Sequence, residues 1–117
     1  VIKTGGEWIS SLELEDLISR HPAVREVAVV GMPDERWGES PFALLVLRDG
    51  EALDASSLQA HMLPFVEQGR INKWGIPRQI AVVSDIPKTS VGKLDKKVMR
   101  LQISQWLAEG NPAISSL

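Results

Sequence analysis

The sequence predicts an α+β domain in which helices pack on a small sheet. Three short apolar or β-branched runs are typical of strands, and three segments carry apolar residues at helical spacing. The two kinds of element alternate irregularly, and the chain holds no repeat or low-complexity segment. This mixture favours a small sheet covered by helices around one core.

The length and composition are those of one globular domain covering residues 1–117. Of the 117 residues, 44% are hydrophobic and 24% are charged, which suffices for one core and is too little for two ordinary domains. The formal net charge of -2 argues against broad electrostatic capture of nucleic acid. No nucleic-acid partner is therefore expected, and any site for an anion must be local.

Missing residue types narrow the function classes further. There is no cysteine for a disulfide or a thiolate metal site, and His21 and His61 are too few to suggest zinc, so no metal ligand is assigned. No apolar run approaches 18 residues and no signal peptide is recognisable, so we expect no membrane span and a cytoplasmic location. Because the chain opens on Val1 without a methionine, we expect a fragment of a larger protein.

The first helix is predicted after Ser10. Ser10 and Glu13 have the spacing of a capping box, and Ile9 with Leu14 can form the accompanying hydrophobic staple. The dipeptide His21-Pro22 should end this helix, because a residue before proline avoids the α region.

Two strands, Val27 to Val30 and Phe42 to Leu47, are expected next, with a shaped loop from Gly31 to Gly38 between them. Asp54 can then cap a second helix. Pro64 must kink or end that helix, because it lacks the N–H that the helix needs.

The last third of the chain predicts an irregular connector, a strand and a helix. Arg70 to Pro77 has no periodicity, and Gln79 to Val83 is typical of a buried strand. Asp95 can cap the final helix, which Gly110 should end. Residues 109–117 are expected to form a loose tail.

The segment "PKTSVGKLDKK", Pro87 to Lys97, gathers lysines around one glycine and is called the lysine loop below. It does not fit a phosphate-binding P-loop, which needs glycine where the chain has Pro87 and serine or threonine where it has Leu94. Asp95 would also compete with an anion at the helix start. Taken alone, Lys88, Lys93, Lys96 and Lys97 are better explained as a solvated turn.

Two longer stretches, "VIKTGGEWISSLELEDLISRHPAVREVAVVGMPDERWGE" and "IPKTSVGKLDKK", together resemble the C-terminal domain of adenylate-forming enzymes. This superfamily includes acyl-CoA synthetases, peptide-synthetase adenylation domains and beetle luciferases. The resemblance covers about residues 1–108 and places three motifs in the family order. Within them and beyond, the segments "GGEWISSLELED" and "GRINKWGIP" are most similar to the corresponding sequences of bacterial medium- to long-chain fatty acyl-CoA ligases.

The resemblance implies a mobile lid domain that closes on a large N-terminal domain. That domain and the hinge would precede Val1, so the fragment alone is expected to be inactive. The complete enzyme would use a fatty acid, ATP, Mg²⁺ and CoA as an acid–thiol ligase, with most of these sites on its own N-terminal domain. Lys93 matches the family lysine that enters the active site during adenylation.

For the second half-reaction, the resemblance implies that the segment around Gly5 and Gly6 lines the channel for the pantetheine arm of CoA. Glu7 and Trp8 belong to the same segment, and Lys3 aligns with a lysine that contributes to the second reaction in some relatives. Two plainer interpretations stay open: a simple hairpin turn for the glycines, and an edge-protecting lysine for Lys3.

The remaining candidates are weaker. Arg70 and Lys73 lie where relatives often place basic residues near the CoA phosphates, although surface solvation explains them better. Trp37 could stack on adenine or simply pack. Trp74 and Trp106 are expected in the core. The histidines receive no catalytic part.

Two other functions stay open from the sequence. An adenylation domain that loads a carrier protein would keep Lys93 and replace free CoA with a pantetheinylated protein. A non-catalytic interaction module would use the lysine loop to bind an acidic partner in a strongly salt-dependent way.

Overall fold

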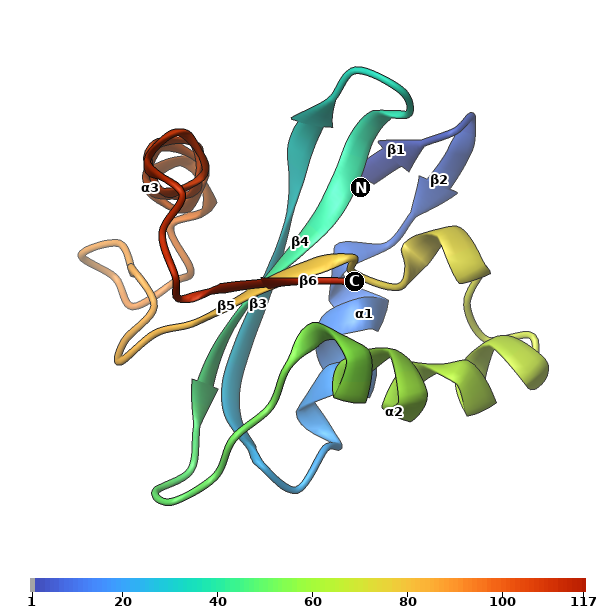
Figure 1. The fold of residues 1–117 in the computed structure, drawn as a ribbon, viewed down its shortest axis with the longest axis horizontal. Helices are drawn as coiled ribbons and strands as arrows, with labels where there is room; N and C mark the ends of the chain where they lie inside the picture. The colour runs from blue at the N-terminus through green and yellow to red at the C-terminus, as the bar shows by residue number, and fades with distance from the viewer. Residues whose placement is uncertain (1) are drawn as a thin grey trace.

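The computed structural model describes residues 2–117 and confirms the α+β class, with helices on both faces of one sheet (Figure 1). The elements follow in the order β1 (Ile2–Thr4), β2 (Glu7–Ile9), α1 (Ser11–Ser19), β3 (Val24–Asp34), β4 (Gly38–Leu47), α2 (Ala55–Glu67), a 3₁₀ turn (Lys73–Gly75), β5 (Gln79–Val82), α3 (Lys96–Glu109) and β6 (Ile114–Ser116).

Strand β4 organises the sheet. Along its whole length it pairs antiparallel with β3, from Val24 opposite Leu47 to Asp34 opposite Gly38. Its other side meets β1 at Gly38 and runs parallel to β5 from Phe42 to Leu45. Strand β6 pairs with the free side of β5, and β2 pairs with β1, so β4 is the central strand of the sheet.

Alternation along the strands divides the core into two layers. Because successive side chains point to opposite faces, Ala43 and Leu45 pack with α1 and α2, whereas Phe42 and Leu44 pack with α3. Figure 1 shows α3 on one side of the sheet and α1 with α2 on the other. The buried helix side chains are Leu14, Leu17 and Ile18 of α1, Ala55, Leu58 and Met62 of α2, and Met99 and Ile103 of α3.

The helix caps form as the sequence predicts. The hydroxyl of Ser10 accepts from the N–H of Glu13 at 3.2 Å, and the carboxylate of Asp95 accepts from the N–H of Val98 at 3.2 Å. The carboxylate of Asp54 caps α2 in the same way. A cap requires only a side-chain acceptor and a backbone N–H three residues later, so the spacing in the sequence is enough to predict it.

The expected loop between β3 and β4 is shorter than predicted. Strand β3 continues through Gly31 and Pro33 to Asp34, so residues 35–37 alone connect it to β4. Strand β3 pairs with β4 and is otherwise an edge of the sheet, and edge strands tolerate proline because one of their sides has no ladder to break. Pro64, which is expected to kink or end the second helix, does not end it: α2 continues past this residue to Glu67.

The expectation of a loose tail at residues 109–117 is wrong. Gly110 does end α3, but Ile114–Ser116 form β6, an antiparallel edge strand on β5. The N–H of Leu117 also donates to the carbonyl oxygen of Arg78 at 2.9 Å. Three residues are too few for a strand pattern in sequence, and the open edge of β5 supplies the backbone partners that order them.

Candidate functional site

Two loops singled out by the sequence lie on different sides of the sheet. The lysine loop connects β5 to α3, and the hairpin formed by β1, Gly5, Gly6 and β2, here called the glycine hairpin, lies beyond β4. Figure 1 shows the lysine loop beside α3 and the glycine hairpin on the side of α1. The two loops therefore belong to separate parts of the domain surface.

The lysine loop is held by its own backbone hydrogen bonds. The N–H of Thr89 donates to the carbonyl oxygen of Lys93 at 2.7 Å, and the N–H of Gly92 donates to that of Thr89 at 2.9 Å. Below this turn, the N–H of Asp95 donates to the carbonyl oxygen of Pro87 at 2.9 Å. The turn thus fixes the backbone from which the Lys93 side chain projects.

Two neighbouring lysines bind carboxylates of the domain itself. The ammonium of Lys88 lies 2.9 Å from Glu26 and 3.6 Å from Asp85. The hydrogen bond to Glu26 is the main factor that raises the pKa of Lys88. The ammonium of Lys96 lies 3.1 Å from Glu15. These two side chains hold the ends of the loop to the body of the domain.

Lys93 differs from both. Its side chain is exposed, and within residues 2–117 its ammonium takes part in no ion pair with a carboxylate. The same loop therefore contains two lysines with carboxylate partners and two exposed lysines, Lys93 and Lys97, that have none among residues 2–117. Because Lys93 is exposed on a hydrogen-bonded turn, its charge is available to a ligand or to another surface.

The glycine hairpin has a two-residue turn. Gly5 and Gly6 have φ values of +56° and +85°, as a type I′ turn requires at both central positions. On the strands beside them, Lys3 lies opposite Trp8, and the Lys3 ammonium is 5.3 Å from the centroid of the Trp8 ring. Trp8 is 69% exposed and Glu7 is exposed too, so this hairpin presents side chains and a bare backbone to the outside.

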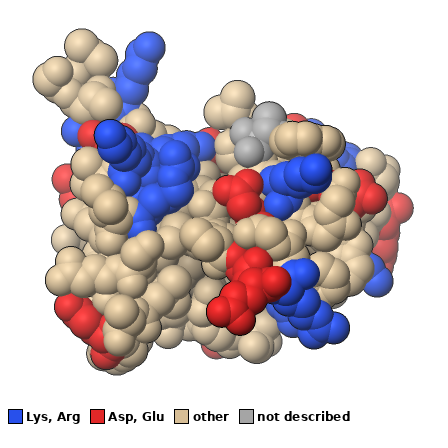
Figure 2. All heavy atoms as spheres, turned by 90° about the horizontal axis from the view of Figure 1, so that it is seen from above, with Lys and Arg blue, Asp and Glu red and all other residues tan. Residues whose placement is uncertain are grey.

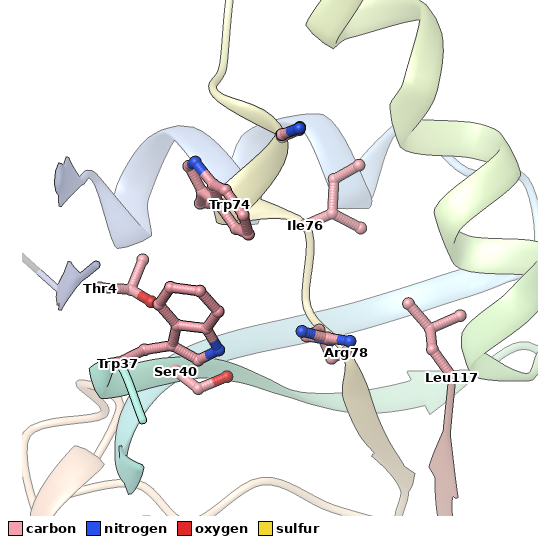
Figure 3. Close-up of a pocket in the computed structure, with 8 residues that line it drawn as sticks. Thr4, Trp37, Ser40, Trp74, Ile76, Arg78 and Leu117 are labelled. Carbon is pink, nitrogen blue, oxygen red and sulfur yellow. The ribbon is translucent and has the colours of Figure 1, made fainter. Parts of the chain in front are cut away.

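Next to the hairpin, two tryptophans form what we call the tryptophan cleft. The Trp37 and Trp74 ring centroids are 5.1 Å apart at an interplanar angle of 39°. Figure 3 shows the two rings next to each other, with Arg78 to their right, and both line a cavity of about 240 Å³. The cavity is lined by Thr4, Trp37, Ser40, Lys73, Trp74, Ile76, Arg78 and Leu117.

Cations surround the two rings of the cleft. The ammonium of Lys73 lies 5.0 Å from the centroid of Trp74, and the guanidinium of Arg36 lies 4.9 Å from that of Trp37. Planar aromatic faces beside several cations suit a ligand with a flat ring and negative charge. The cleft is thus a second place where the domain could bind part of a substrate.

The expectation that Trp74 lies in the core is wrong, because this residue is 40% exposed. In the 3₁₀ turn, Gly75 is the buried residue, and a Cβ there would lie 3.3 Å from Ile9. Trp74 consequently points outward into the cleft. Trp106, by contrast, packs partly buried against the core under α3, as expected.

Sequence reasoning missed Arg78 and the pairing of Trp74 with Trp37. Lys73, Trp74 and Arg78 place aromatic and basic residues within six positions of an irregular segment, and that clustering was the available signal. The pairing itself depends on the sheet, which brings residue 37 next to residue 74.

Arg70 binds a partner within the domain. Its guanidinium lies 3.1 Å from the carboxylate of Glu13, which therefore serves this ion pair rather than the second half of a capping box. Arg70 and Trp8 both line a smaller pocket of about 200 Å³ beside the glycine hairpin. The structure thus brings Arg70 near Trp8, whose ring also lies beside the Lys3 ammonium, while Lys93 lies elsewhere.

His21 and His61 form a pair that the sequence did not reveal. Their rings meet edge to face at 5.0 Å, and Nε2 of His61 lies 2.9 Å from the carbonyl oxygen of Leu17. Burial lowers the pKa of His21, His61 lowers it further, and Glu51 opposes the shift. Both ring positions are structural, and within residues 2–117 no group of three or more acidic or histidine side chains could hold a metal ion.

Charge is unevenly distributed on the face shown in Figure 2. Lys and Arg side chains gather at the left, which is the α3 side of Figure 1, whereas acidic and basic side chains intermingle to the right. Over residues 2–117, none of the helices has both the length and the apolar character needed to cross a membrane.

Comparisons with known proteins agree with this architecture. Residues 13–93 match the AMP-binding enzyme C-terminal domain. The chain is 40% identical over 106 residues to a long-chain-fatty-acid–CoA ligase of Thermus thermophilus, covering 91% of the chain and 19% of that protein. It is 39% identical over 107 residues to a 3-methylmercaptopropionyl-CoA ligase of Ruegeria pomeroyi, covering 92% and 19%.

Solved structures give the same result. An acyl-CoA synthetase of Brucella canis superposes with a TM-score of 0.77 at 31% identity, over 92% of this chain and 19% of that one. A fatty acyl CoA synthetase of Mycobacterium tuberculosis gives 0.73 at 32% identity, over 87% and 19%. The chain therefore spans about a fifth of the length of the relatives it matches. With its fold, its motif order and these matches in agreement, the chain belongs to the family of AMP-binding enzyme C-terminal domains.

Proposed function

We propose that the chain is the mobile C-terminal lid of an AMP-forming fatty acyl-CoA ligase and that Lys93 serves its adenylation step. The observation that carries this proposal is the difference among the lysines of one loop. Lys88 and Lys96 are engaged by carboxylates of the domain, whereas the exposed Lys93 ammonium projects from a hydrogen-bonded turn. The names of the relatives, several of which are fatty acid–CoA ligases, support the reaction class.

The chemistry of adenylation suits such a cation. When a carboxylate attacks ATP, negative charge is present on the attacking oxygen, the α-phosphate and the departing pyrophosphate. An ammonium held among them lowers the barrier electrostatically and does not need to transfer a proton. Removing one such positioned charge typically costs roughly 100- to 1000-fold in rate.

The opposite side of the domain would serve the attack of the CoA thiol on the acyl-adenylate. At Gly5 and Gly6 no Cβ obstructs an approaching chain, so the pantetheine arm could pass close to the backbone. We propose that the adenine nucleotide of CoA binds in the tryptophan cleft, with its ring on Trp37 or Trp74 and its phosphates near Lys73 and Arg78.

Of the expected cofactors, this chain would bind CoA, whereas ATP and Mg²⁺ would be bound mostly by the rest of the enzyme. CoA fits the cleft and hairpin as described. Among residues 2–117, no carboxylate cluster fits Mg²⁺, so Mg²⁺ and most of the ATP site are assigned to the larger part of the enzyme, as is the fatty acid pocket. The N-terminal domain is thus the partner against which this lid would close, and the cytoplasmic location stays a prediction.

The test uses the full-length enzyme with Lys93→Ala and, as a matched control, Lys97→Ala, which removes an exposed lysine of the same segment. We expect pyrophosphate release from ATP and fatty acid to fall by about 100- to 1000-fold in Lys93→Ala. Conversion of supplied acyl-adenylate to acyl-CoA should stay near the unmodified rate. Equal loss in both half-reactions, or normal adenylation without the Lys93 charge, would contradict the proposal.

The tryptophan cleft also separates the ligase from its two alternatives. Free CoA carries an adenine nucleotide that a carrier protein lacks, so a cleft of aromatic rings and cations favours CoA as the acceptor. Assaying the full-length enzyme with both acceptors decides between them. A non-catalytic module would instead show strongly salt-dependent binding of an acidic partner by this domain alone.

A further inference from the structure

One side chain supplements the attachment of the glycine hairpin to the sheet. Strand β1 meets β4 through a single residue pair, Thr4 with Gly38. Beyond that pair, the N–H of Lys3 donates to Oε1 of Glu39 at 3.2 Å. A carboxylate therefore binds the Lys3 amide where the backbone ladder between the two strands stops.

The position of the Glu39 carboxyl group depends on the absence of a side chain at Gly31. If residue 31 had a Cβ, that atom would lie 2.8 Å from Oε2 of Glu39 and 3.2 Å from Cγ1 of Ile2. Gly31 does not have a positive φ, so the backbone conformation does not require glycine here. Space for the carboxyl group and for Ile2 is the requirement, and it couples Gly31 to Glu39.

The same corner of the sheet carries the tryptophan cleft. Glu39 lies two residues after Trp37, which belongs to the turn between β3 and β4. The carboxylate of Asp34 stabilises this turn by accepting from the N–H groups of Arg36 and Trp37 at 2.8 Å and 3.0 Å. The N–H of Gly5 in turn donates to the carbonyl oxygen of Trp37 at 2.9 Å. Trp37 in this turn and Glu39 at the start of β4 thus bind Gly5, just after β1, and Lys3, in the middle of β1.

We propose that Glu39 is a positioning residue for the thiol-transfer step. By binding the Lys3 amide, it keeps the glycine hairpin aligned with the tryptophan cleft, so that the two halves of CoA are received in one geometry. Glu39 touches no substrate in this scheme and acts through the hairpin. The inference rests on the proposed function, because it takes the hairpin and the cleft to be the CoA site.

The test compares Glu39→Ala, Glu39→Gln and Gly31→Ala in the full-length enzyme. Glu35→Ala serves as the control, because it removes an exposed glutamate from the adjacent turn. The amide of glutamine can still accept from the Lys3 N–H, whereas alanine cannot. Hydrogen exchange of residues 2–9 should quicken in Glu39→Ala and Gly31→Ala, and stay near normal in Glu39→Gln and Glu35→Ala. This readout does not depend on catalysis.

The kinetic readout separates the two half-reactions. In Glu39→Ala and Gly31→Ala, the KM for CoA should rise roughly threefold to tenfold, the effect of losing about one hydrogen bond. Pyrophosphate release should be unchanged, and Glu39→Gln should restore most of the CoA affinity. Because Glu39→Ala removes the atom that a Cβ at residue 31 would contact, the double variant should lose less than the sum of the two single losses.

Three results would overturn the inference: unchanged exchange of residues 2–9, equal damage to adenylation and thiol transfer, or additive effects of the two substitutions. Faster exchange with an unchanged KM for CoA would also refute the assigned role, since the hairpin would then be loosened without consequence for CoA. The Lys93→Ala experiment fails or succeeds independently of all four results, so the inference and the proposed function can be judged separately. Glu39→Gln and Gly31→Ala keep the test informative if Glu39→Ala does not fold.

Discussion

The backbone N–H of Gly5 donates to the carbonyl oxygen of Trp37 at 2.9 Å, and the Trp37 ring lies 3.2 Å from the place where a Cβ of Gly5 would be. This contact joins the glycine hairpin to the tryptophan cleft. Two segments that the sequence treats as separate motifs are therefore one surface. It also makes residue 5 sensitive to substitution for two reasons, backbone conformation and contact with the ring.

Gly5→Ala should consequently be more damaging than Gly6→Ala. Both residues have positive φ, but a Cβ at Gly6 meets nothing within 4 Å, whereas one at Gly5 meets Trp37. We expect each substitution to cost about 1 kcal/mol for the strained φ, with a further loss at Gly5 from displacement of the ring. Chemical unfolding of the two variants side by side measures the difference, and equal losses would contradict the contact.

Removing a cation from the cleft should affect CoA through its nucleotide. For Arg78→Ala in the full-length enzyme, we expect the KM for CoA to rise about tenfold or more, the loss of one charge-assisted hydrogen bond. The KM for pantetheine, which lacks the nucleotide, should not change. A parallel rise for both thiols would place the loss outside nucleotide binding.

Trp74→Ala tests the aromatic half of the same site. Trp74 is 40% exposed and is not needed for the core, so the thermal midpoint should change little. Loss of a stacking surface should weaken CoA binding by roughly 1 to 3 kcal/mol. Trp106→Ala is the matched control: it should destabilise the fold because Trp106 packs against the core under α3, and leave the KM for CoA unaltered.

The histidine pair predicts acid sensitivity of the fold. Burial and then His61 lower the folded-state pKa of His21 below its ordinary value of 6.5. The unfolded chain therefore binds the proton more readily, so stability is full above about pH 6.5 and declines as the pH falls toward the folded-state pKa. Thermal melts of the chain across this range should show the decline, and His21→Asn, which retains an acceptor near the Ala23 N–H, should flatten it. A melting profile of equal slope in both proteins would refute this assignment.

Strand β6 can be tested through one hydroxyl. The Ser115 side chain accepts from the N–H of Ala55, the first residue of α2, at 3.0 Å. Ser115→Ala should cost about 1 kcal/mol, because that buried N–H loses its acceptor. Ser104→Ala, at an exposed position of α3, serves as the control. Equal stability of the two variants would mean that residues 114–116 do not dock in solution.

The sequence predicted what depends on neighbouring residues. The caps at Ser10, Asp54 and Asp95 are confirmed because each requires a side chain and an N–H three residues apart. Periodicity likewise placed Met99 and Ile103 of α3 in the core correctly.

Features that depend on distant segments were missed. The outward direction of Trp74 follows from the burial of Gly75 against Ile9, far away in the sequence. Strand β6 exists because β5 offers an open edge, which no local pattern reveals. For the candidate site, motif order located Lys93 and the glycine hairpin, but only the fold distinguishes Lys93 from Lys88 and Lys96 by their carboxylate partners.

The outward cation of the lysine loop has a practical consequence for reading genetic variation. Because the Lys93 side chain forms no ion pair within residues 2–117, its charge should not contribute to the stability of the fold. A variant with a neutral residue at position 93 should therefore be as abundant in cells as the normal protein. Surveys that score expression level would rate such an allele harmless, and an assay of enzymatic output would be needed to detect the loss of adenylation that we propose.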